Sequence, residues 1–288
     1  MLAAVSSSIA SDSREREFQA AAVIAALELE LAGEAALAED REPLTSELDL
    51  LDRVFADLSG HEVREVLEVG CGLGNLLIPL LRRGLWVTGL DVEPEAVAGC
   101  RRQLARHNLS TRVMHGDVRT LAADASYDAV LLMRGLVSLL EVEGEQLDAL
   151  RRVRRALRPG GLLVLDHRNL LALWPVFGRK LIRSGTLADG GRWELGRQAS
   201  VASYEGRVYE RRWVRFDDLD GESKLFVQHD NLRITTVSET LALLRHAGFE
   251  VLGTEPHPLI DDGWAEVAQF GIGEVDPAYV WIVARRPS

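Results

Sequence analysis

The chain has little of what marks a secreted or membrane-spanning protein. Its 288 residues contain only two cysteines, Cys71 and Cys100, which are too few for a disulfide framework. Its first residues lack the basic start and the long apolar core of a signal peptide. No uncharged run reaches the roughly 18 residues that are needed to span a bilayer. These absences predict a soluble, cytoplasmic protein in a reducing compartment, with no membrane partner.

Positive charge is also scarce. The sequence has 33 Lys and Arg against 44 Asp and Glu, which gives a formal net charge of −11. Proteins that bind a phosphate backbone carry a basic stripe, and the sequence has none, so we expect no nucleic-acid partner. Histidines such as His115, His229 and His246 show no metal-ligand spacing with cysteines or acids, and we expect no metal. What the chain does have is 47% hydrophobic residues, enough to bury a large core.

Apolar, strand-like runs alternate with helix-like segments from about residue 65 to residue 170. We expect strands at 65–70, 86–91, 112–117, 127–133 and from 162, with helices at 75–84, 93–108 and 144–161. Two further helices are expected earlier, at about 18–38 and 46–58. Strands that alternate with helices in this way predict a parallel, doubly wound sheet that is covered on both faces.

The pattern changes after residue 170. Three strand-like runs, beginning near Ala199, Arg207 and Ser223, are separated by short Gly-containing turns and predict an antiparallel meander. A helix at 237–249 and two strands, at 250–256 and 278–286, would then close the sheet. We therefore expect residues 170–236 to be an insertion that forms a cap.

The stretch VLEVGCGLGN places Gly70, Gly72 and Gly74 directly between a predicted strand and a predicted helix. Glycine allows a tight turn and lets the backbone approach a ligand, and the start of the following helix offers N–H donors. A dinucleotide fingerprint would need another glycine where the chain has Asn75, which counts against a hydride-transfer enzyme. The G-x-G-x-G spacing, with Glu68 two residues before it, resembles motif I of the class I S-adenosyl-L-methionine-dependent methyltransferases.

Four further landmarks follow in the order that this family has. Asp91 ends the second predicted strand, 21 residues after Gly70, and Asp117 ends the third, while YDAVLLM and LRPGGLLVL match the fourth strand and the helix-turn-strand after it. By resemblance, Asp91 would accept hydrogen bonds from the ribose hydroxyls, Asp117 would contact adenine, and Glu68 would face the methionine ammonium. S-adenosylmethionine would be the cofactor and S-adenosylhomocysteine the product. The cofactor-binding residues that the resemblance implies are Glu68, Gly70, Cys71, Gly72, Gly74, Asp91, Val92, Asp117, Val118, Met133 and, in the segment that covers the cofactor in relatives, Arg41.

The end of the fifth predicted strand, LLVLDHRN, resembles the same strand end in glycine N-methyltransferase and its small-amine relatives. In that group the arginine binds the substrate carboxylate, which a planar, permanently charged guanidinium suits. The resemblance implies this role for Arg168, and His167 is a candidate base because its ordinary pKa lies near neutrality. The candidate catalytic residues are therefore His167, Arg168 and Asn169. Each has a structural alternative: a hydrogen-bonded strand end for His167, an ion pair with Asp166 for Arg168, and a turn or cap for Asn169.

Two departures argue against glycine itself as the substrate. After the fourth strand the glycine enzyme has an Asn that helps to hold its substrate, where this chain has Gly135. That enzyme also uses tyrosines of its N-terminal region, and this chain has no tyrosine before Tyr127. A different small-molecule substrate, an amine or an amino-acid-like metabolite, fits better. An amine that has lost its proton can attack the methyl group without a strong base, whereas a hydroxyl acceptor gains more from one.

These patterns predict an α/β fold with a Rossmann-like, doubly wound, mostly parallel seven-stranded sheet, an antiparallel β cap insertion and N-terminal helices. The expected divisions are an N-terminal helical segment or lid at 1–59, a cofactor-binding core at 60–169, a β cap on the substrate side at 170–236, and the C-terminal helix and closing strands of the core at 237–288. The acidic N-terminal helices would serve as a lid over the cofactor or as a contact in a homo-oligomer.

Three functions stay open on the sequence alone. The first is N-methylation of a small molecule, and the second is O-methylation of a small metabolite. The third is a non-catalytic protein that binds S-adenosylmethionine. Methylation of a nucleic-acid base is not favoured, because no Asn/Asp-Pro-Pro-aromatic stretch follows the fourth predicted strand.

Overall fold

The computed structural model describes residues 20, 24, 45–140, 142, 144–171, 177–187, 190–256 and 279–288. The chain divides into two compact units. The core unit comprises Leu44–Leu173, Arg233–Ile260 and Gln269–Ser288, and the insertion unit comprises Met1–Pro43, Trp174–Leu232 and Asp261–Ala268. This division places helix α2 (Thr45–Leu58) with the core, whereas the sequence suggested a boundary after residue 59. The helix expected at 18–38 lies outside the described residues, apart from Ala20 and Ile24.

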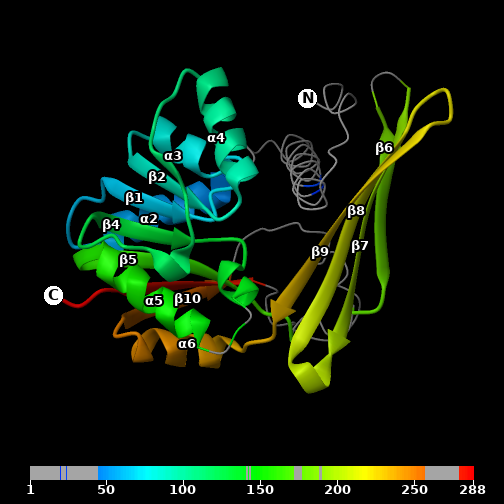
Figure 1. The fold of residues 1–288 in the computed structure, drawn as a ribbon. Coiled ribbons are helices and arrows are strands. Elements are labelled where there is room, and N and C mark those ends of the chain that lie inside the picture. Colours follow the sequence, from blue (N-terminus) through cyan, green and yellow to red (C-terminus); the bar gives the residue numbers. More distant parts are fainter. Residues whose placement is uncertain are drawn as a thin grey trace. The chain divides into compact units, whose positions relative to one another are not determined.

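The core unit is built on a seven-stranded sheet with the order β10-β11-β5-β4-β1-β2-β3 (Figure 1). Near its centre, β1 (Glu65–Val69) pairs in parallel with β2 (Trp86–Asp91) and with β4 (Tyr127–Leu132). Strands β3 and β5 extend the parallel part, whereas β11 runs antiparallel to both β5 and β10. The bounds of these four strands are Val113–His115 for β3, Leu157–Arg168 for β5, Glu250–Pro256 for β10 and Tyr279–Arg285 for β11. The mostly parallel seven-stranded sheet that the sequence predicts is confirmed.

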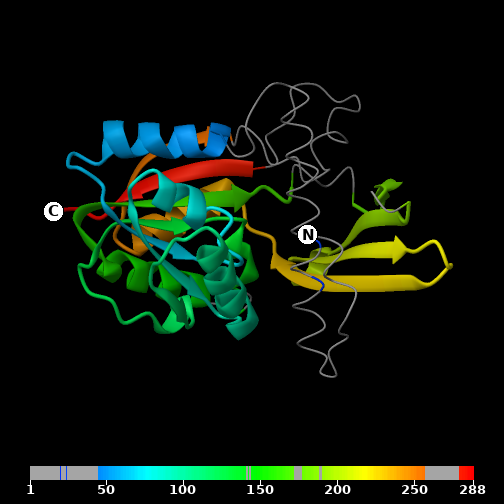
Figure 2. The same ribbon diagram turned by 90° about the horizontal axis from the view of Figure 1, so that it is seen from above.

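Helices cover both faces of this sheet, as its apolar strands require. In β4, Ala129 and Leu131 lie in one buried cluster with residues of α2, α3 and α4, and Figure 2 shows α2 lying along its face of the sheet. Val130 and Leu132 lie in the opposite cluster with residues of α5 and α6. This alternation follows from the two-residue period of a strand. The remaining helices are α3 (Leu77–Arg82), α4 (Pro94–Arg106), α5 (Glu145–Ala156) and α6 (Val237–His246), with short 3-10 helices η2 (Val118–Thr120) and η3 (Leu136–Leu139).

The junction between α5 and β5 differs from the prediction. The sequence suggested a helix to residue 161, but α5 ends at Ala156 and β5 begins at Leu157, so that Pro159, Gly160 and Gly161 belong to the strand. Proline cannot continue a helix, because it lacks the N–H donor and its ring clashes with the preceding turn. The Gly160 N–H donates to the Arg286 carbonyl at 2.8 Å, and the Arg286 N–H donates to the Gly161 carbonyl at 2.9 Å. These bonds tie the Pro-Gly-Gly stretch to the chain just after β11.

The insertion unit contains a four-stranded sheet with the order β6-β7-β8-β9, in which β7 is antiparallel to β6 and to β8. The antiparallel insertion is therefore confirmed, but the sequence did not predict β6, whose exposed and half-buried residues alternate without a buried apolar stripe. Ile24 and Val214 form a small buried cluster in this unit, against partly buried aromatic residues such as Trp193 and Phe216. The strand bounds are Lys180–Thr186, Arg192–Ala202, Arg207–Asp217 and Ser223–Arg233, and η5 (Ser203–Glu205) lies between β7 and β8.

Two features are absent from the part of the chain that the structure describes. None of the helices in the described ranges is both long and apolar enough to cross a membrane. In the same part of the chain, no three side chains of His, Cys, Asp or Glu come together as a set that could hold a metal ion.

Candidate active site

The glycine loop follows β1 and has a backbone that favours glycine. Gly70, Gly72 and Gly74 have φ angles of +72°, +53° and +87°, in the left-handed region. A Cβ at Gly70 would lie 2.7 Å from the Leu136 Cδ1 atom, and a Cβ at Gly74 would lie 2.9 Å from the Cys100 Sγ atom. At Gly72, by contrast, a Cβ would meet no heavy atom of the described residues within 4 Å. The loop therefore packs tightly at both ends and is open at its centre, where a ligand can approach the backbone.

Asp91, at the end of β2, is fixed against this loop. Its Oδ2 atom accepts a hydrogen bond from the Gly72 N–H at 2.7 Å, and its Oδ1 atom accepts one from the Glu93 N–H at 3.0 Å. A carboxylate has about four lone-pair sites, so Asp91 can also accept from two hydroxyl groups. The side chain of Val92, which comes next, is 52% exposed. The structure therefore brings Asp91 to the open centre of the glycine loop, as its predicted ribose-binding role requires.

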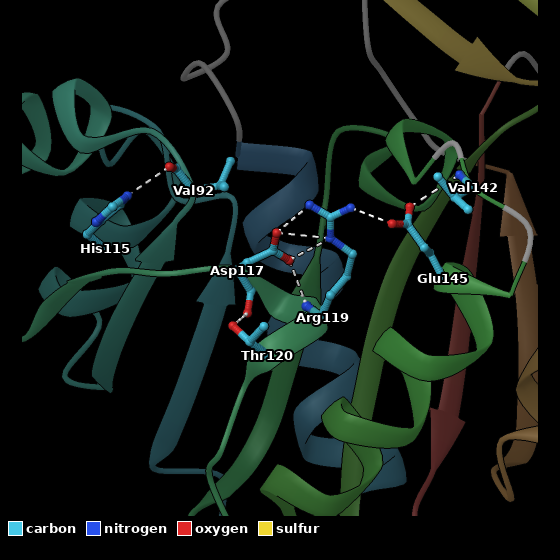
Figure 3. Close-up of polar contacts among 7 residues, drawn as sticks. All are labelled: Val92, His115, Asp117, Arg119, Thr120, Val142 and Glu145. Carbon is cyan, nitrogen blue, oxygen red and sulfur yellow. Dashed lines mark hydrogen bonds and ion pairs between the residues drawn. The ribbon is translucent and has the colours of Figure 1, made fainter.

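A chain of ion pairs lies beside the end of β3 (Figure 3). The Arg119 guanidinium donates to Asp117 Oδ2 at 2.5 Å through Nη2 and to Glu145 Oε1 at 2.6 Å through Nη1. Glu145 in turn accepts a hydrogen bond from the Val142 N–H at 3.2 Å. The bonds from the Arg119 side chain hold the pKa of Asp117 below its ordinary value. Asp117 is thus kept ionised at the place where the sequence suggested adenine binding, and Val118 beside it is buried.

The sequence did not point to Arg119 or Glu145. An acidic residue followed two positions later by arginine is a weak signal, since the pair can bond locally without any ligand. The connection from Arg119 to Glu145 joins η2 to the first turn of α5, and only the folded chain shows it.

The sulfur atoms of two buried cysteines pack at the glycine loop. Cys71 and Cys100 are both free and buried. The hydrogen bond between them, together with burial, raises the pKa of the Cys71 thiol, which keeps it neutral. A Cβ at Gly89 would lie 2.8 Å from the Cys71 Sγ atom, so the sulfur packs directly against β2. Cys71 therefore contributes packing to the loop, and Met133, buried after β4, contributes to the same core cluster.

Three charged side chains meet between β1, α2 and the end of β4. Glu68 on β1 is 5% exposed and Glu47 in the first turn of α2 is 2% exposed. The Arg134 Nη2 atom donates to Glu47 Oε2 at 3.2 Å. Burial raises the pKa of Glu47, and burial raises that of Glu68 well above its ordinary value. The sequence pointed to Glu68 alone, because Glu47 and Arg134 are 87 residues apart.

The end of β5 sends its polar side chains in different directions. Asp166 is fully buried and accepts hydrogen bonds from the Arg134 N–H at 2.8 Å and the Gly135 N–H at 2.5 Å. His167, 2% exposed, lies next to α6, where its Nδ1 atom is 3.0 Å from the Thr240 hydroxyl. Burial lowers the pKa of His167 to about 4. Neighbouring residues of a strand face opposite sides of a sheet, so Asp166 and His167 cannot serve one site together.

Arg168 and Asn169 complete this strand end. The Arg168 guanidinium carbon lies 5.7 Å from the centre of the Tyr279 ring, at the start of β11, which is a cation–π distance. Both Arg168 and Asn169 are half-buried. Tyr279 was not predicted from the sequence, because its place beside Arg168 depends on the antiparallel pairing of β11 with β5. The proposed cofactor residue Arg41 lies outside the described residues.

These features fit the methionine and ribose portions of S-adenosylmethionine. The glycine loop leaves an open centre at Gly72, and Asp91 lies beside it with acceptor capacity to spare. Among the described residues, the buried Glu68 Oε2 atom has no hydrogen-bond partner. A buried carboxylate oxygen without a partner is costly, and an ammonium group would satisfy it.

Comparison with known proteins agrees with this geometry. Residues 66–161 match the family model described as a methyltransferase domain. The chain is 26% identical over 194 residues to the cypemycin N-terminal methyltransferase of a Streptomyces species, covering 67% of this chain and 75% of that one. It is 35% identical over 171 residues to the ubiquinone biosynthesis O-methyltransferase of Methylocella silvestris, covering 56% of this chain and 64% of that one.

A solved structure extends the likeness to the whole fold. The S-adenosylmethionine-bound amino pentose methyltransferase of calicheamicin biosynthesis, from Micromonospora echinaspora, matches with a TM-score of 0.64 at 23% identity, covering 88% of this chain and 95% of that one. Residues 66–161 are therefore similar to a methyltransferase domain, and the chain shares the fold of this S-adenosylmethionine-bound methyltransferase.

Proposed function

We propose that this protein transfers the methyl group of S-adenosylmethionine to the nitrogen of a small-molecule amine or amino-acid-like metabolite. The observation that carries the choice of nitrogen is the state of His167. Its ring is 2% exposed, hydrogen-bonded to Thr240 on α6, and has a pKa of about 4. A general base must reach the proton that it removes and must have a pKa near the working pH. His167 meets neither requirement, so we assign it a structural role.

The bound cofactor supplies an electrophilic methyl group on a sulfonium centre. The residues of the chain hold and orient it: the glycine loop receives the methionine portion, Asp91 the ribose and Asp117 the adenine. Because an amine free of its proton attacks without a strong base, proximity and alignment can supply much of the rate. A hydroxyl acceptor would depend more on a base. The described strand end offers no exposed histidine for that purpose, since His167 is packed beneath α6.

Arg168 is our candidate for binding an acceptor carboxylate. It follows the last buried residue of β5 at the carboxyl edge of the sheet, which is where parallel sheets bind their ligands. The Tyr279 ring restrains its guanidinium from one side, and a planar guanidinium can bond a carboxylate through two N–H groups. Asn169, the next residue, belongs to the same strand end. The sequence of this strand end resembles that of the glycine N-methyltransferase group, which supports an acceptor that carries a carboxylate.

The relatives support an amine acceptor and also define the alternative. The cypemycin enzyme is named as an N-terminal methyltransferase and the calicheamicin enzyme as an amino pentose methyltransferase. O-methylation is the second candidate, because the ubiquinone enzyme, named as an O-methyltransferase, is 35% identical to this chain.

Pairs of acceptors that share one carbon skeleton test this proposal. The purified protein would be incubated with isotope-labelled S-adenosylmethionine and either an amine or its hydroxyl analogue, for example β-alanine and its hydroxy acid, and the products identified by mass spectrometry. We expect label on the amine member of a pair and not on its hydroxyl partner. Methylation of hydroxyl analogues alone would favour the second candidate. Failure to bind either S-adenosylmethionine or S-adenosylhomocysteine in calorimetry would exclude every methyltransferase function.

The role of Arg168 has its own test. Loss of a charged hydrogen-bond partner costs about 1.5–3 kcal/mol, so Arg168→Ala should raise the KM for acceptors that carry a carboxylate by roughly 10- to 150-fold. The Kd for S-adenosylhomocysteine should not change. Arg102→Ala, on an exposed position of α4, is the matched control and should leave both constants unchanged. An unchanged KM in Arg168→Ala would contradict the carboxylate-binding role.

A further inference from the structure

A cluster beside the glycine loop combines two glutamate side chains with one arginine side chain. Glu68 comes from β1, Glu47 from the first turn of α2, and Arg134 from the segment after β4. Both carboxylates are almost completely buried, whereas the Arg134 side chain is 48% exposed although it is bonded to Glu47 at 3.2 Å. The two acids are thus enclosed in the core unit, and the arginine side chain bonded to one of them is partly exposed.

The carboxylates of this cluster are incompletely bonded. Glu47 Oε2 accepts from Arg134, but among the described residues neither Glu47 Oε1 nor Glu68 Oε2 has a hydrogen-bond partner. Leaving a buried acceptor without a partner costs about 1–3 kcal/mol, and more for a charged group. Side chains with this cost persist where a ligand completes the bonding. A group that carries N–H donors and a positive charge would satisfy both oxygens.

The backbone holds Arg134 in a strained conformation. Its φ angle is +65°, which for a residue with a side chain costs about 1–2 kcal/mol, and Gly135 follows with a φ of +67°. Asp166 stabilises this pair by accepting a hydrogen bond from each of the two N–H groups, at 2.8 Å and 2.5 Å. Strain that the surrounding structure supports in this way is common at ligand sites. Here it fixes the direction in which the arginine leaves the main chain.

The cluster therefore matches a ligand with an ammonium and a carboxylate on one carbon. Glu68 interacts electrostatically with Asp91, whose carboxylate accepts a hydrogen bond from the Gly72 N–H, so the cluster lies near the open centre of the glycine loop. The geometry points to Arg134 as the residue that binds the carboxylate of the methionine portion of S-adenosylmethionine, held in place by Glu47, while Glu47 and Glu68 face the ammonium. Arg134 thus takes the part that the sequence suggested for Arg41. This assignment rests on the cofactor of the proposed function and not on its acceptor.

Two ligands that differ only in the amino-acid portion separate this role from others. S-adenosylhomocysteine carries the ammonium and carboxylate, and methylthioadenosine lacks both. Isothermal titration calorimetry on the full chain should show that Arg134→Ala weakens S-adenosylhomocysteine roughly 10- to 100-fold, as expected for one charged hydrogen-bonding partner, and leaves methylthioadenosine within twofold. Arg83→Ala is the matched control, because Arg83 also pairs with a carboxylate of α2, Asp49, at 3.2 Å. It should leave both affinities unchanged.

A second variant tests how Arg134 is held. Glu47→Gln should weaken S-adenosylhomocysteine by itself, but by much less in the Arg134→Ala background, because the residue that it positions is then absent. Equal weakening of both ligands in Arg134→Ala would overturn the proposal, since it would mean a general disturbance of the site. Unchanged S-adenosylhomocysteine affinity with a raised acceptor KM would also overturn it, by placing Arg134 on the acceptor. If the unaltered protein binds neither ligand, the proposed function fails together with this inference.

Discussion

Replacing Gly72 by alanine separates the stability of the glycine loop from its capacity to bind a ligand. Gly72 has a φ of +53°, and an added Cβ would meet no heavy atom of the described residues within 4 Å. The cost to the fold is therefore the left-handed backbone alone, about 1 kcal/mol for a residue with a Cβ. For a domain of this size we expect the Tm to fall by about 2–4 °C.

The same methyl group would occupy the space that we propose for the methionine portion of the cofactor. The loop cannot readily turn it aside, because the Gly72 N–H is bonded to Asp91 at 2.7 Å. We expect the Kd for S-adenosylhomocysteine, measured by isothermal titration calorimetry, to rise at least about tenfold, which corresponds to about 1.4 kcal/mol.

Gly60→Ala is the matched control for this change. Gly60 has a φ of +70° and an equally open Cβ position, but it lies in the turn after α2 and not in the glycine loop. It should lower the Tm by a similar amount and leave the Kd unchanged. If Gly72→Ala binds S-adenosylhomocysteine within twofold of the unaltered protein, the open centre of the loop is not where the cofactor binds, and the reasoning is refuted.

Three further predictions concern buried titratable groups. Asp166→Ala leaves two backbone N–H groups without their acceptor and should lower the free energy of unfolding by about 2–4 kcal/mol in urea titrations. Asp124→Ala, which removes an exposed ion pair, should change the free energy of unfolding by less than about 1 kcal/mol. Equal effects of the two substitutions would contradict the stabilising role of the hydrogen bonds to Asp166. The pKa of His167 in the folded protein is about 4, below its ordinary 6.5, so the unfolded chain takes up a proton first as the pH falls. The free energy of unfolding should therefore fall by about 2 kcal/mol between pH 7 and pH 5. His167→Gln should remove this loss. Burial raises the pKa of Glu68 in the free protein, so an ammonium that binds beside it should displace the proton of the Glu68 carboxyl group. Calorimetry in buffers of different ionisation enthalpy should detect this proton release. The release should be absent in Glu68→Gln.

The sequence predicted most of the core sheet because its signals are local. The strand at 86–91 and the strand at 250–256 have the predicted bounds, since each is a short apolar or alternating run between clear breaks. The predicted start of β5 was wrong because a Pro-Gly-Gly stretch normally ends a helix or strand. Here it joins the sheet through hydrogen bonds to Arg286. Strand β6 was missed because it lacks the apolar stripe that reveals a strand.

The candidate site could be predicted from the sequence only where its residues belong to one motif or to predicted strand ends, and not where they come from distant segments. Spacing within motif I and at strand ends placed Gly72 and Asp91 near each other, and their hydrogen bond joins residues 19 positions apart. The bond from Arg134 to Glu47 joins residues 87 positions apart, and that from Thr240 to His167 joins residues 73 positions apart. No local pattern encodes such pairs, because they depend on how α2 and α6 pack on opposite faces of the sheet.

The hydrogen bond between His167 and Thr240 has a consequence for how this protein can change over evolutionary time. The chain leaves the core after β5 and returns at α6, and this bond joins the two at a distance of 3.0 Å. A hydrogen bond between two core residues thus holds together the two ends of the intervening segment. Since the entropy cost of closing a connection grows only with the logarithm of its length, segments of very different length and sequence could be exchanged there. The residues that we assign to cofactor binding would keep their positions while the rest of the protein diversified.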